Sequence, residues 1–187
     1  MRIIAGKLRG RRLKSPPTLD ARPTSDRLRE TLFNILAPRI EGARFLDLCA
    51  GSGAIGIEAL SRGAIHTTFV DRSRSMVTLI KSNLVLCQFS DTAATVVVSE
   101  ADSFLKRFDK SSSVRWDIIY FDPPYDSDYT MTLNFLGAHR ALLSAAGIVV
   151  VEHSHRNELA DTFGELHRYR LLKQGDSRLS FFAPADQ

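Results

Sequence analysis

Residue types that build specialised proteins are scarce in this 187-residue chain. It has 2 cysteines, Cys49 and Cys87, with no Cys-x-x-Cys pair and no cluster of cysteine and histidine. A disulfide framework and a zinc site are therefore both unsupported, and we expect no metal. Cysteine usage of this kind fits a reducing setting, so a cytoplasmic location is expected.

Long apolar runs are also missing. None approaches the roughly eighteen residues that a membrane-spanning helix requires, so we expect no membrane partner. The Arg-rich start resembles a transit peptide, but Gly6 and Gly10 would weaken an amphipathic helix, and we interpret it as mature protein. Hydrophobic residues make up 44% and charged residues 25% of the chain, which is ordinary globular usage. One domain, 1–187, is expected.

Positive charge is concentrated at the N-terminus, although the net charge of the chain is only +4. The basic residues that precede the first acidic one, Asp20, are Arg2, Lys7, Arg9, Arg11, Arg12 and Lys14. Because each neutralised phosphate releases condensed counterions, such a segment favours a polyanionic partner. The alternative is a solvated basic tail. We call residues 1–24 the basic arm.

Apolar periodicity and turn signals predict alternating strands and helices. Helices are expected from Thr24 or Ser25 to Pro38, over 55–62, 73–86 and 130–143, and around Phe104. Strands are expected over 45–49, 66–70, 96–98, 116–121 and 148–151. Two further runs, 169–172 and 179–182, flank a Gly-containing turn and predict an antiparallel hairpin. The fold class is therefore doubly wound α/β, with a basic N-terminal extension and a C-terminal hairpin that completes the sheet.

A glycine-rich turn follows the first predicted strand. Gly51, Gly53 and Gly56 satisfy the Gly-x-Gly-x-x-Gly spacing, and Asp71 ends the next strand about twenty residues on. Glycine suits the turn because a strand that passes directly into a helix needs unusual backbone angles and a close approach of the ligand. Asp71 can accept hydrogen bonds from ribose hydroxyls, which favours an adenosine-containing cofactor.

Two more acids help to choose that cofactor. Asp47 lies inside the first apolar strand, where a negative charge would favour a sulfonium and ammonium ligand but not a pyrophosphate. We expect it to hold the glycine loop or to reach the ammonium; the alternative is a buried acid satisfied by backbone N–H groups. Asp102 follows the third strand and is expected to meet the adenine amino group, or else to cap a helix that begins at Ser103.

The motif Asp122-Pro123-Pro124-Tyr125, directly after the fourth apolar run, is the most specific feature. Successive prolines make a stiff turn whose carbonyl groups stay unpaired and point outward. The lone pair of an exocyclic base amine is delocalised into the ring, and acceptors at Asp122 and Pro123 would let the nitrogen pyramidalise and attack a sulfonium methyl. Tyr125 offers a face on which an extruded base could stack. The alternative is a Pro-rich loop with a buried tyrosine.

Taken together, these segments resemble the class I methyltransferases, and more narrowly the RsmD-type guanine-N2 methyltransferases of small-subunit ribosomal RNA. The resemblance covers nearly the whole chain and rests on residues 1–11, 22–34, 47–53 and 122–125. It implies a Rossmann-like sheet with S-adenosylmethionine as cofactor. The implied reaction is methylation of guanine N2 at the guanine-966 site of 16S ribosomal RNA, within an assembled or assembling 30S subunit.

The resemblance also implies roles for individual residues. It makes Asp122 catalytic, together with Pro123, Pro124 and Tyr125. It assigns RNA contacts to the basic arm, for which the candidates are Arg2, Lys7, Arg9, Arg11 and Arg12. The cofactor cleft is expected to contain Asp47, Ala50, Gly51, Ser52, Gly53, Asp71, Arg72, Asp102 and Ser103, with Arg22 and Thr24 nearby.

Other functions fit parts of the pattern. A DNA adenine-N6 or protein glutamine-N5 methyltransferase would keep the chemistry, but glutamine enzymes resemble Asn-Pro-Pro-Tyr, and little sequence remains here for a DNA-recognition region. A non-catalytic RNA-binding assembly factor predicts a degraded cofactor loop, and a dehydrogenase leaves Asp47 and the double proline without a purpose. His153 and His155 are expected at surface or capping positions, because the chemistry needs no histidine.

Overall fold

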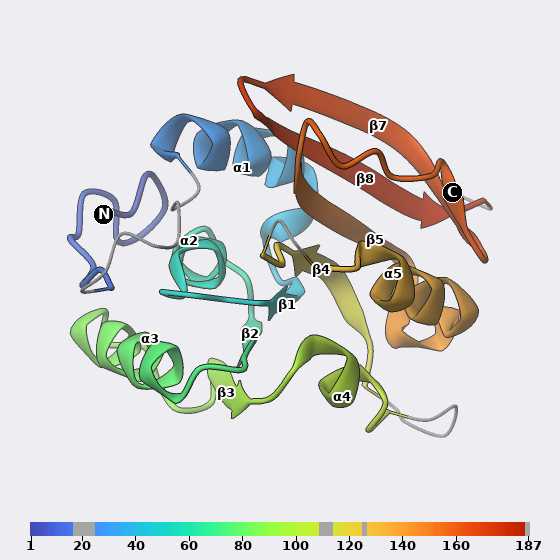
Figure 1. Cartoon of the computed structure of the whole chain (residues 1–187). Coiled ribbons are helices and arrows are strands. Elements are labelled where there is room, and N and C mark those ends of the chain that lie inside the picture. Colours follow the sequence, from blue (N-terminus) through green and yellow to red (C-terminus); the bar gives the residue numbers. More distant parts are fainter. Residues whose placement is uncertain (17–24, 109–113, 125–126, 186–187) are drawn as a thin grey trace.

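The computed structural model describes residues 1–16, 25–108, 114–124 and 127–185. In this part of the chain, eight strands form one sheet in the order β3-β2-β1-β4-β5-β8-β7-β6 (Figure 1). The strands are β1 Arg44–Leu48, β2 His66–Asp71, β3 Ala94–Val98, β4 Trp116–Phe121, β5 Leu143–Ser154, β6 Thr162–Phe163, β7 Leu166–Gln174 and β8 Ser177–Pro184. The helices are α1 Asp26–Ile40, α2 Ala54–Ser61, α3 Arg74–Leu86, α4 Ala101–Leu105, α5 Tyr129–Ala138 and the 3-10 helix η1 Arg140–Leu142.

The sheet is parallel from β3 to β5 and antiparallel beyond β5. Strand β8 pairs with β5 along Val149–Ser154, and β7 forms the predicted hairpin with β8. The direction of strand order reverses between β1 and β4, which is where ligands bind in open α/β sheets. The doubly wound α/β fold with a C-terminal hairpin is therefore confirmed.

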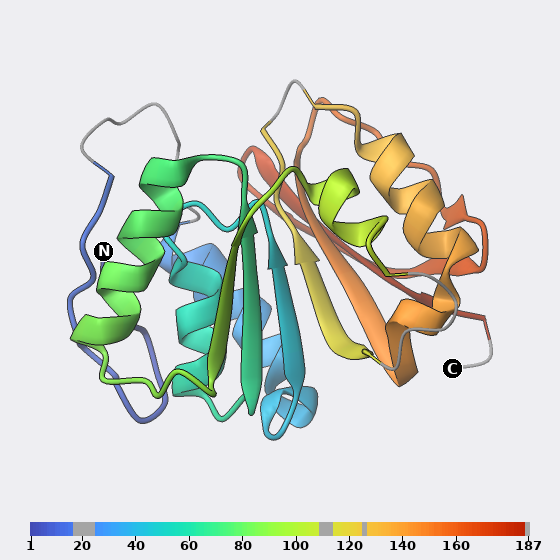
Figure 2. The ribbon, with the colours of Figure 1, turned by 90° about the horizontal axis from the view of Figure 1, so that it is seen from below.

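Helices cover both faces of the sheet. Helices α1, α2 and α3 lie on one face, and α4 and α5 lie on the other (Figure 2). Alternate residues of one strand accordingly enter two separate cores, with Phe45 of β1 against the first set of helices and Leu46 against the second. Burial on both faces explains why the central strands are almost continuously apolar.

The described part of the basic arm, residues 1–16, is an ordered part of the fold. Its two limbs meet at a bridge between Arg2 and Arg12, and Ile3 and Leu13 are buried. The turn at Gly6 lies directly on α2: its φ is +81°, and a Cβ there would come within 2.0 Å of the Ser61 carbonyl oxygen. Only glycine permits this approach. The backbone of residues 1–16 is therefore not a solvated tail.

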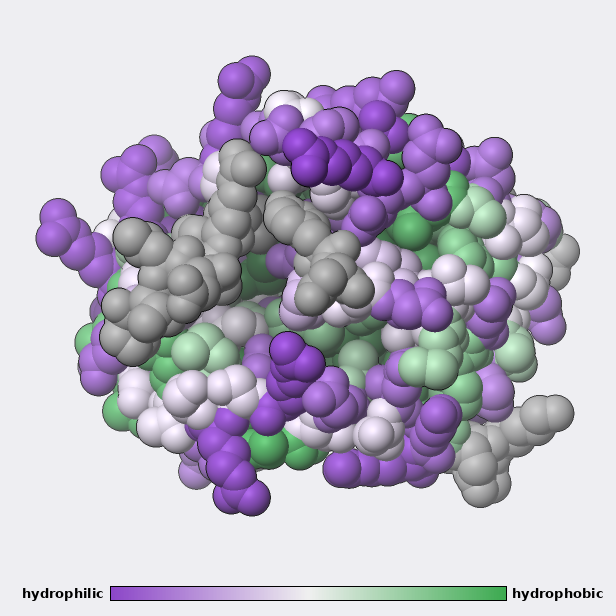
Figure 3. Space-filling view, in the orientation of Figure 1, coloured by the Kyte–Doolittle hydropathy of each residue, from purple (hydrophilic) through white to green (hydrophobic). Residues whose placement is uncertain are grey.

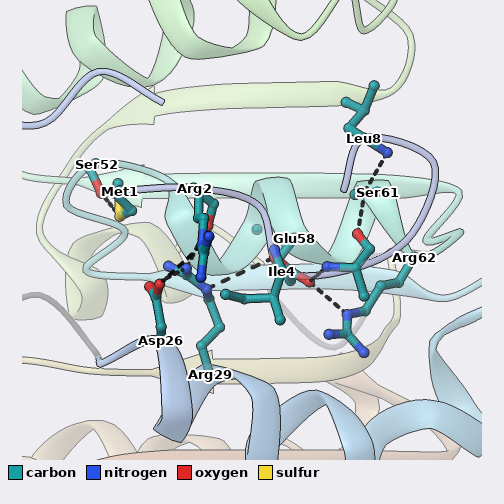
Figure 4. A network of polar contacts seen from close by, with 12 residues as sticks. Met1, Arg2, Ile4, Leu8, Asp26, Arg29, Ser52, Glu58, Ser61 and Arg62 are labelled. Carbon is teal, nitrogen blue, oxygen red and sulfur yellow. Dashed lines mark hydrogen bonds and ion pairs between the residues drawn. The ribbon is translucent and has the colours of Figure 1, made fainter. Parts of the chain in front are cut away.

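A buried ionic network joins the arm to α1 and α2 (Figure 4). The Glu58 carboxylate is fully buried and accepts hydrogen bonds from the backbone N–H groups of Ile4 and Ala5 at 2.8 and 2.9 Å. Arg62 Nε donates to the same carboxylate at 2.8 Å, and Arg29 Nε lies 3.9 Å from it. Burial lowers the pKa of Arg29, and the negative charges of Asp26, 2.8 Å away, and Glu58 oppose this shift and offset the cost of burying the guanidinium.

Two predicted boundaries are wrong. Helix α1 continues past Pro38 to Ile40, because a proline in the last turn loses only one main-chain hydrogen bond, while Leu36 and Ile40 on either side are buried. The predicted helix 130–143 ends at Ala138, since His139 has left helical angles, and β5 already begins at Leu143. No helix among the described ranges is long and apolar enough to cross a membrane.

The network makes a stability prediction. In a Glu58→Ala variant, the buried N–H groups of Ile4 and Ala5 would lose their acceptor, and Arg29 would keep only the half-exposed Asp26 as counter-ion, at 2.8 Å. The free energy of unfolding should therefore fall by about 3–5 kcal/mol. Urea unfolding measures this loss, and faster trypsin cleavage within the arm reports its release. Glu30→Ala, an exposed position on α1, should leave both unchanged. Equal unfolding midpoints for Glu58→Ala and the wild type would show that the network contributes nothing.

Candidate active site

The parallel strands end at one edge of the sheet, and acidic side chains gather there. This edge faces the viewer in Figure 1 and lies at the top in Figure 2. Asp47 lies in β1, Asp71 ends β2, Asp122 follows β4 directly, and Glu152 lies near the end of β5. The surface of this face is hollowed near its middle (Figure 3). Four carboxyl groups on adjacent strands make it a site suited to cationic or N–H-rich ligands.

The glycine loop turns sharply between β1 and α2. Cys49, Gly51 and Gly53 have φ values of 63°, 54° and 80°, all in the left-handed region. Gly53 precedes the first turn of α2, and its N–H donates to the Ala50 carbonyl at 2.8 Å. Such angles are costly for residues with a Cβ, which explains the glycines here. Burial and the neighbouring carboxylates raise the pKa of Cys49, so its thiol stays protonated.

Asp47 and Asp71 hold the loop from two sides. Asp47 Oδ2 accepts from Gly56 N at 2.9 Å, and Asp71 Oδ2 accepts from Gly51 N at 2.8 Å. Asp71 Oδ1 also accepts from Ser73 N at 2.8 Å. Two roles are expected for Asp47 from the sequence: support of the glycine loop, or a buried acid bonded to backbone N–H groups. The hydrogen bond from Gly56 serves both roles at once. Contacts of either acid with a ligand remain predictions.

Burial raises the pKa of Asp47 to about 7, because the hydrogen bond from Gly56 offsets burial only in part and Asp71 adds repulsion. The Asp47 carboxyl group is therefore partly protonated near neutral pH, and a nearby cation would lower its pKa and favour release of the proton. Among the other cofactor candidates, Arg72 is exposed and lies 4.0 Å from Glu100.

Asp102 is connected to α5. Its Oδ1 accepts from the Thr132 hydroxyl at 2.5 Å, and the N-cap position of α4 belongs to Glu100. The expectation that Asp102 caps this helix is therefore wrong; it lies in the first turn, with Ser103 exposed beside it. A contact with adenine remains a prediction.

The Asp-Pro-Pro corner lies beside the glycine loop. Asp122 N donates to the carbonyl of Leu48, the last residue of β1, at 3.4 Å. Burial raises the pKa of Asp122 well above its ordinary value, and the negative charges of Glu152 and Asp47 raise it further. An acid with this pKa binds a proton readily and gains from ligands that supply N–H donors.

The two proline carbonyls differ. The Pro124 carbonyl accepts from Ser127 N at 2.9 Å, so the expectation that both stay unpaired is wrong for Pro124. The Pro123 carbonyl makes no hydrogen bond to another described residue. Three further candidates, Tyr125, Arg22 and Thr24, lie outside the described residues.

Sequence reasoning missed two buried polar residues of this region. Glu152 accepts a hydrogen bond from the Tyr120 hydroxyl at 2.5 Å. Asn83 of α3 donates to the Ser52 carbonyl at 3.1 Å, and it exchanges hydrogen bonds with the backbone of Lys14. Glu152 ends an apolar strand just as Asp71 does, so the same rule could have found it. Asn83 interrupts the apolar face of its helix, which was its only signal.

The two histidines differ in their surroundings. His153 is buried, and its Nδ1 lies 2.8 Å from the Asn157 carbonyl and its Nε2 lies 2.9 Å from the Ser180 hydroxyl. Burial lowers its pKa, which favours the neutral ring. The expected surface position is therefore wrong for His153, because long-range partners satisfy both ring nitrogens. His155 is exposed.

The five arm candidates for RNA contact are not equivalent. Arg2 lies 3.6 Å from Asp26, and Arg11 donates to the Leu86 carbonyl at 2.6 Å. Lys7, Arg9 and Arg12 are exposed, and their side chains make no hydrogen bond or ion pair within the described part of the chain. Those three are the better candidates for phosphate contacts.

The raised pKa of Asp47 makes a pH prediction. Below about pH 4 both folded and unfolded chains are protonated at Asp47, whereas between 3.8 and about 7 only the folded chain keeps the proton. This contribution to stability is therefore lost as pH rises through that window, by up to about 1.4 kcal/mol per unit. Asp47→Asn still accepts from Gly56 but does not titrate, so the stability of the variant relative to the wild type should rise from pH 4 to about 7 and level off above that.

Urea unfolding of the cofactor-free protein at several pH values measures this difference. Asp91→Asn, at an exposed position, should follow the wild type throughout. Parallel curves for wild type and Asp47→Asn would contradict the assignment of the shift to Asp47.

Known proteins share this architecture. The family model described as "Conserved hypothetical protein 95" matches residues 1–183. The chain is 38% identical to "Ribosomal RNA small subunit methyltransferase D" of Escherichia coli K12, covering 96% of this chain and 88% of that protein. It is 39% identical to YlbH of Bacillus subtilis, covering 89% of each. The solved structure of Escherichia coli yhhF has a TM-score of 0.85 at 34% identity, covering 100% and 99% of the two chains. The chain therefore belongs to the family described as Conserved hypothetical protein 95.

Proposed function

We propose that this protein transfers the methyl group of S-adenosylmethionine to the exocyclic N2 of a guanine in small-subunit ribosomal RNA, at the guanine-966 site of 16S ribosomal RNA, in the cytoplasm. The observation that carries this proposal is the position of Asp122 and Pro123 directly beside the glycine loop, through the hydrogen bond from Asp122 N to the carbonyl of Leu48. The relatives named as small-subunit ribosomal RNA methyltransferases support the substrate class.

The loop residues fit the cofactor. A Cβ at Gly51 would meet no atom within 4 Å, so a ligand can approach the backbone there closely. The Asp71 carboxylate is only partly buried, and each oxygen retains acceptor capacity for a ribose hydroxyl beyond its backbone bond. Asp47 lies behind the loop, and a cationic cofactor would favour its ionised form, so the pair is electrostatically matched. The bound cofactor supplies an electrophilic methyl group on sulfonium sulfur.

Asp122 and Pro123 would prepare the amine. Their oxygens accept the two N–H hydrogens, which withdraws the nitrogen lone pair from the ring and directs it towards the glycine loop. Asp122 must be ionised to accept. After transfer the nitrogen is strongly acidic, and the raised pKa of Asp122 makes this carboxylate a competent acceptor for the released proton.

The basic arm would bind the RNA backbone. Lys7, Arg9 and Arg12 are exposed on a segment that is fixed to α2 through Glu58 and Ser61. A fixed segment loses less conformational entropy on binding than a free tail. We infer that these cations position the phosphates while the target base enters the acidic corner.

Labelled S-adenosylmethionine tests the substrate. The protein is incubated separately with unmethylated 30S subunits, naked 16S RNA, genomic DNA and release-factor protein, and the modified residue is identified by mass spectrometry. We expect label on guanine N2 of the subunit RNA. Label only on DNA adenine or on protein glutamine would reject the RNA substrate, and no label on any substrate would favour a non-catalytic assembly factor.

The same assay tests Asp122. Asp122→Ala removes an acceptor from the reacting amine, so kcat should fall by at least about 10²-fold, while cofactor affinity measured by calorimetry changes little. Asp91→Ala, at an exposed position away from this edge, is the matched control. Unchanged turnover in Asp122→Ala would mean that the chemistry lies elsewhere.

The arm makes a separate prediction about salt. Replacing Lys7, Arg9 and Arg12 with Ala should weaken RNA binding and lower the slope of log K against log salt by about 2 to 3, since each phosphate contact adds about 0.7 to 0.9. Fluorescence anisotropy across a salt series measures the slope. A triple variant of other exposed cations, Lys106, Arg156 and Lys173, should keep it. An identical slope in both triples would exclude the arm as an RNA contact.

A further inference from the structure

The acid that sequence reasoning missed, Glu152, lies next to the proposed catalytic acid. Strands β4 and β5 are parallel, with Tyr120 opposite Val150 and Phe121 opposite Val151. Continuing this register by one residue brings Asp122 beside Glu152 on the same face of the sheet. Adjacent strands lie about 4.8 Å apart, which is within reach of two groups that bind one small ligand.

The Glu152 side chain is buried and held in one orientation. The residue is 4% exposed, and the Tyr120 hydroxyl donates to its Oε2. A carboxylate can accept about four hydrogen bonds, so Glu152 can keep its protein partners and still accept a hydrogen bond from a ligand. The negative charge of Glu152 is also the largest electrostatic cause of the raised pKa of Asp122.

The order of the strands indicates on which side of Asp122 the methyl donor lies and on which side the base lies. Asp47, Asp122 and Glu152 lie on β1, β4 and β5, which are consecutive neighbours in the sheet. The glycine loop follows β1, so the methyl donor would approach Asp122 from the β1 side. In-line transfer requires the nitrogen, the methyl carbon and the sulfur to be collinear, so the base cannot occupy the donor's side of the amine. The side towards Glu152 is then open to the ring.

The chemistry of guanine matches this arrangement. Its N1–H is the neighbour of the N2 amine on the Watson–Crick edge, so both donors point towards one protein surface. We propose that Glu152 is a specificity-determining residue, which accepts the N1–H of the target guanine while Asp122 accepts the N2 amine. The inference rests on the proposed guanine-N2 transfer and deepens it.

The arrangement also rejects other bases. Adenine and 2-aminopurine carry an unprotonated N1, whose lone pair would face the Glu152 carboxylate. A site built to accept a substrate N–H discriminates strongly against an analogue that lacks it, because its buried polar group is left unpaired. Guanine would then be selected in two ways: Glu152 attracts its N1–H, and Glu152 repels the N1 lone pair of the other bases.

A base swap tests the proposal. Substrate RNA carries either guanine or 2-aminopurine at the methylated position; 2-aminopurine keeps the reacting N2 amine but lacks the N1 hydrogen. Wild-type protein should prefer guanine by about 10²-fold or more in kcat/KM. Glu152→Gln can present its amide N–H to the unprotonated N1, so the preference should fall at least about tenfold.

The ratio of kcat/KM for the guanine RNA to kcat/KM for the 2-aminopurine RNA separates an effect on base recognition from an effect on folding. A purely structural loss would lower both rates together and leave the preference for guanine intact, which would overturn the proposal. Glu158→Gln, an exposed glutamate after the same strand, should keep the wild-type preference. Should Glu152→Gln fail to fold, Tyr120→Phe removes the orienting hydroxyl and should lower the preference by a smaller factor.

The wild-type measurement keeps the two proposals distinguishable. If wild-type protein methylates both RNAs at rates within about threefold, Glu152 does not select guanine, although the proposed methyl transfer stands. If it methylates neither RNA and no other ribosomal RNA guanine, the proposed function itself fails.

Discussion

The constraint on which the rest of the site depends is a pair of carboxylates, the buried Asp47 and the partly buried Asp71, which hold the glycine loop. Asp47 binds the N–H of Gly56 in the first turn of α2, and Asp71 binds the N–H of Gly51 within the loop. These bonds satisfy main-chain donors at a helix start, where intrahelical partners are lacking. They also leave negative charge directly behind the surface on which a cofactor would lie.

The acidic side chains at this edge of the sheet repel one another in the free protein, and the same charges favour binding of cationic ligands. Desolvation and mutual repulsion raise the pKa values of both Asp47 and Asp122. Ligands that bring positive charge or N–H donors relieve this electrostatic repulsion, so the free energy of binding favours them. A sulfonium cofactor and a base amine supply both, so the electrostatics of the free protein are complementary to the proposed reactants.

The basic arm is positively charged, in contrast to the acidic edge of the sheet, and it is fixed to α2 and α3. Glu58 and Ser61 of α2 bind its backbone, and Asn83 of α3 binds both Lys14 and the carbonyl of Ser52 in the glycine loop. The exposed cations of the arm and the glycine loop therefore share a rigid support. A phosphate backbone on the arm and a base in the acidic corner are compatible with one another because each meets charge of the sign it needs.

The sequence by itself determined the alternation of strands and helices, the glycine turn, the position of Asp47 inside a strand, and the positions of Asp71 and Asp122 at strand ends, because local periodicity and turn chemistry specify these features. The partners of the buried polar groups depended on the tertiary structure. Glu58 binds backbone 54 residues away, Asn83 binds Lys14 across 69, and Tyr120 meets Glu152 across 32. The extension of α1 past Pro38 likewise followed from burial of Ile40. Such contacts form only when distant segments pack together, and no local pattern encodes which segments those are.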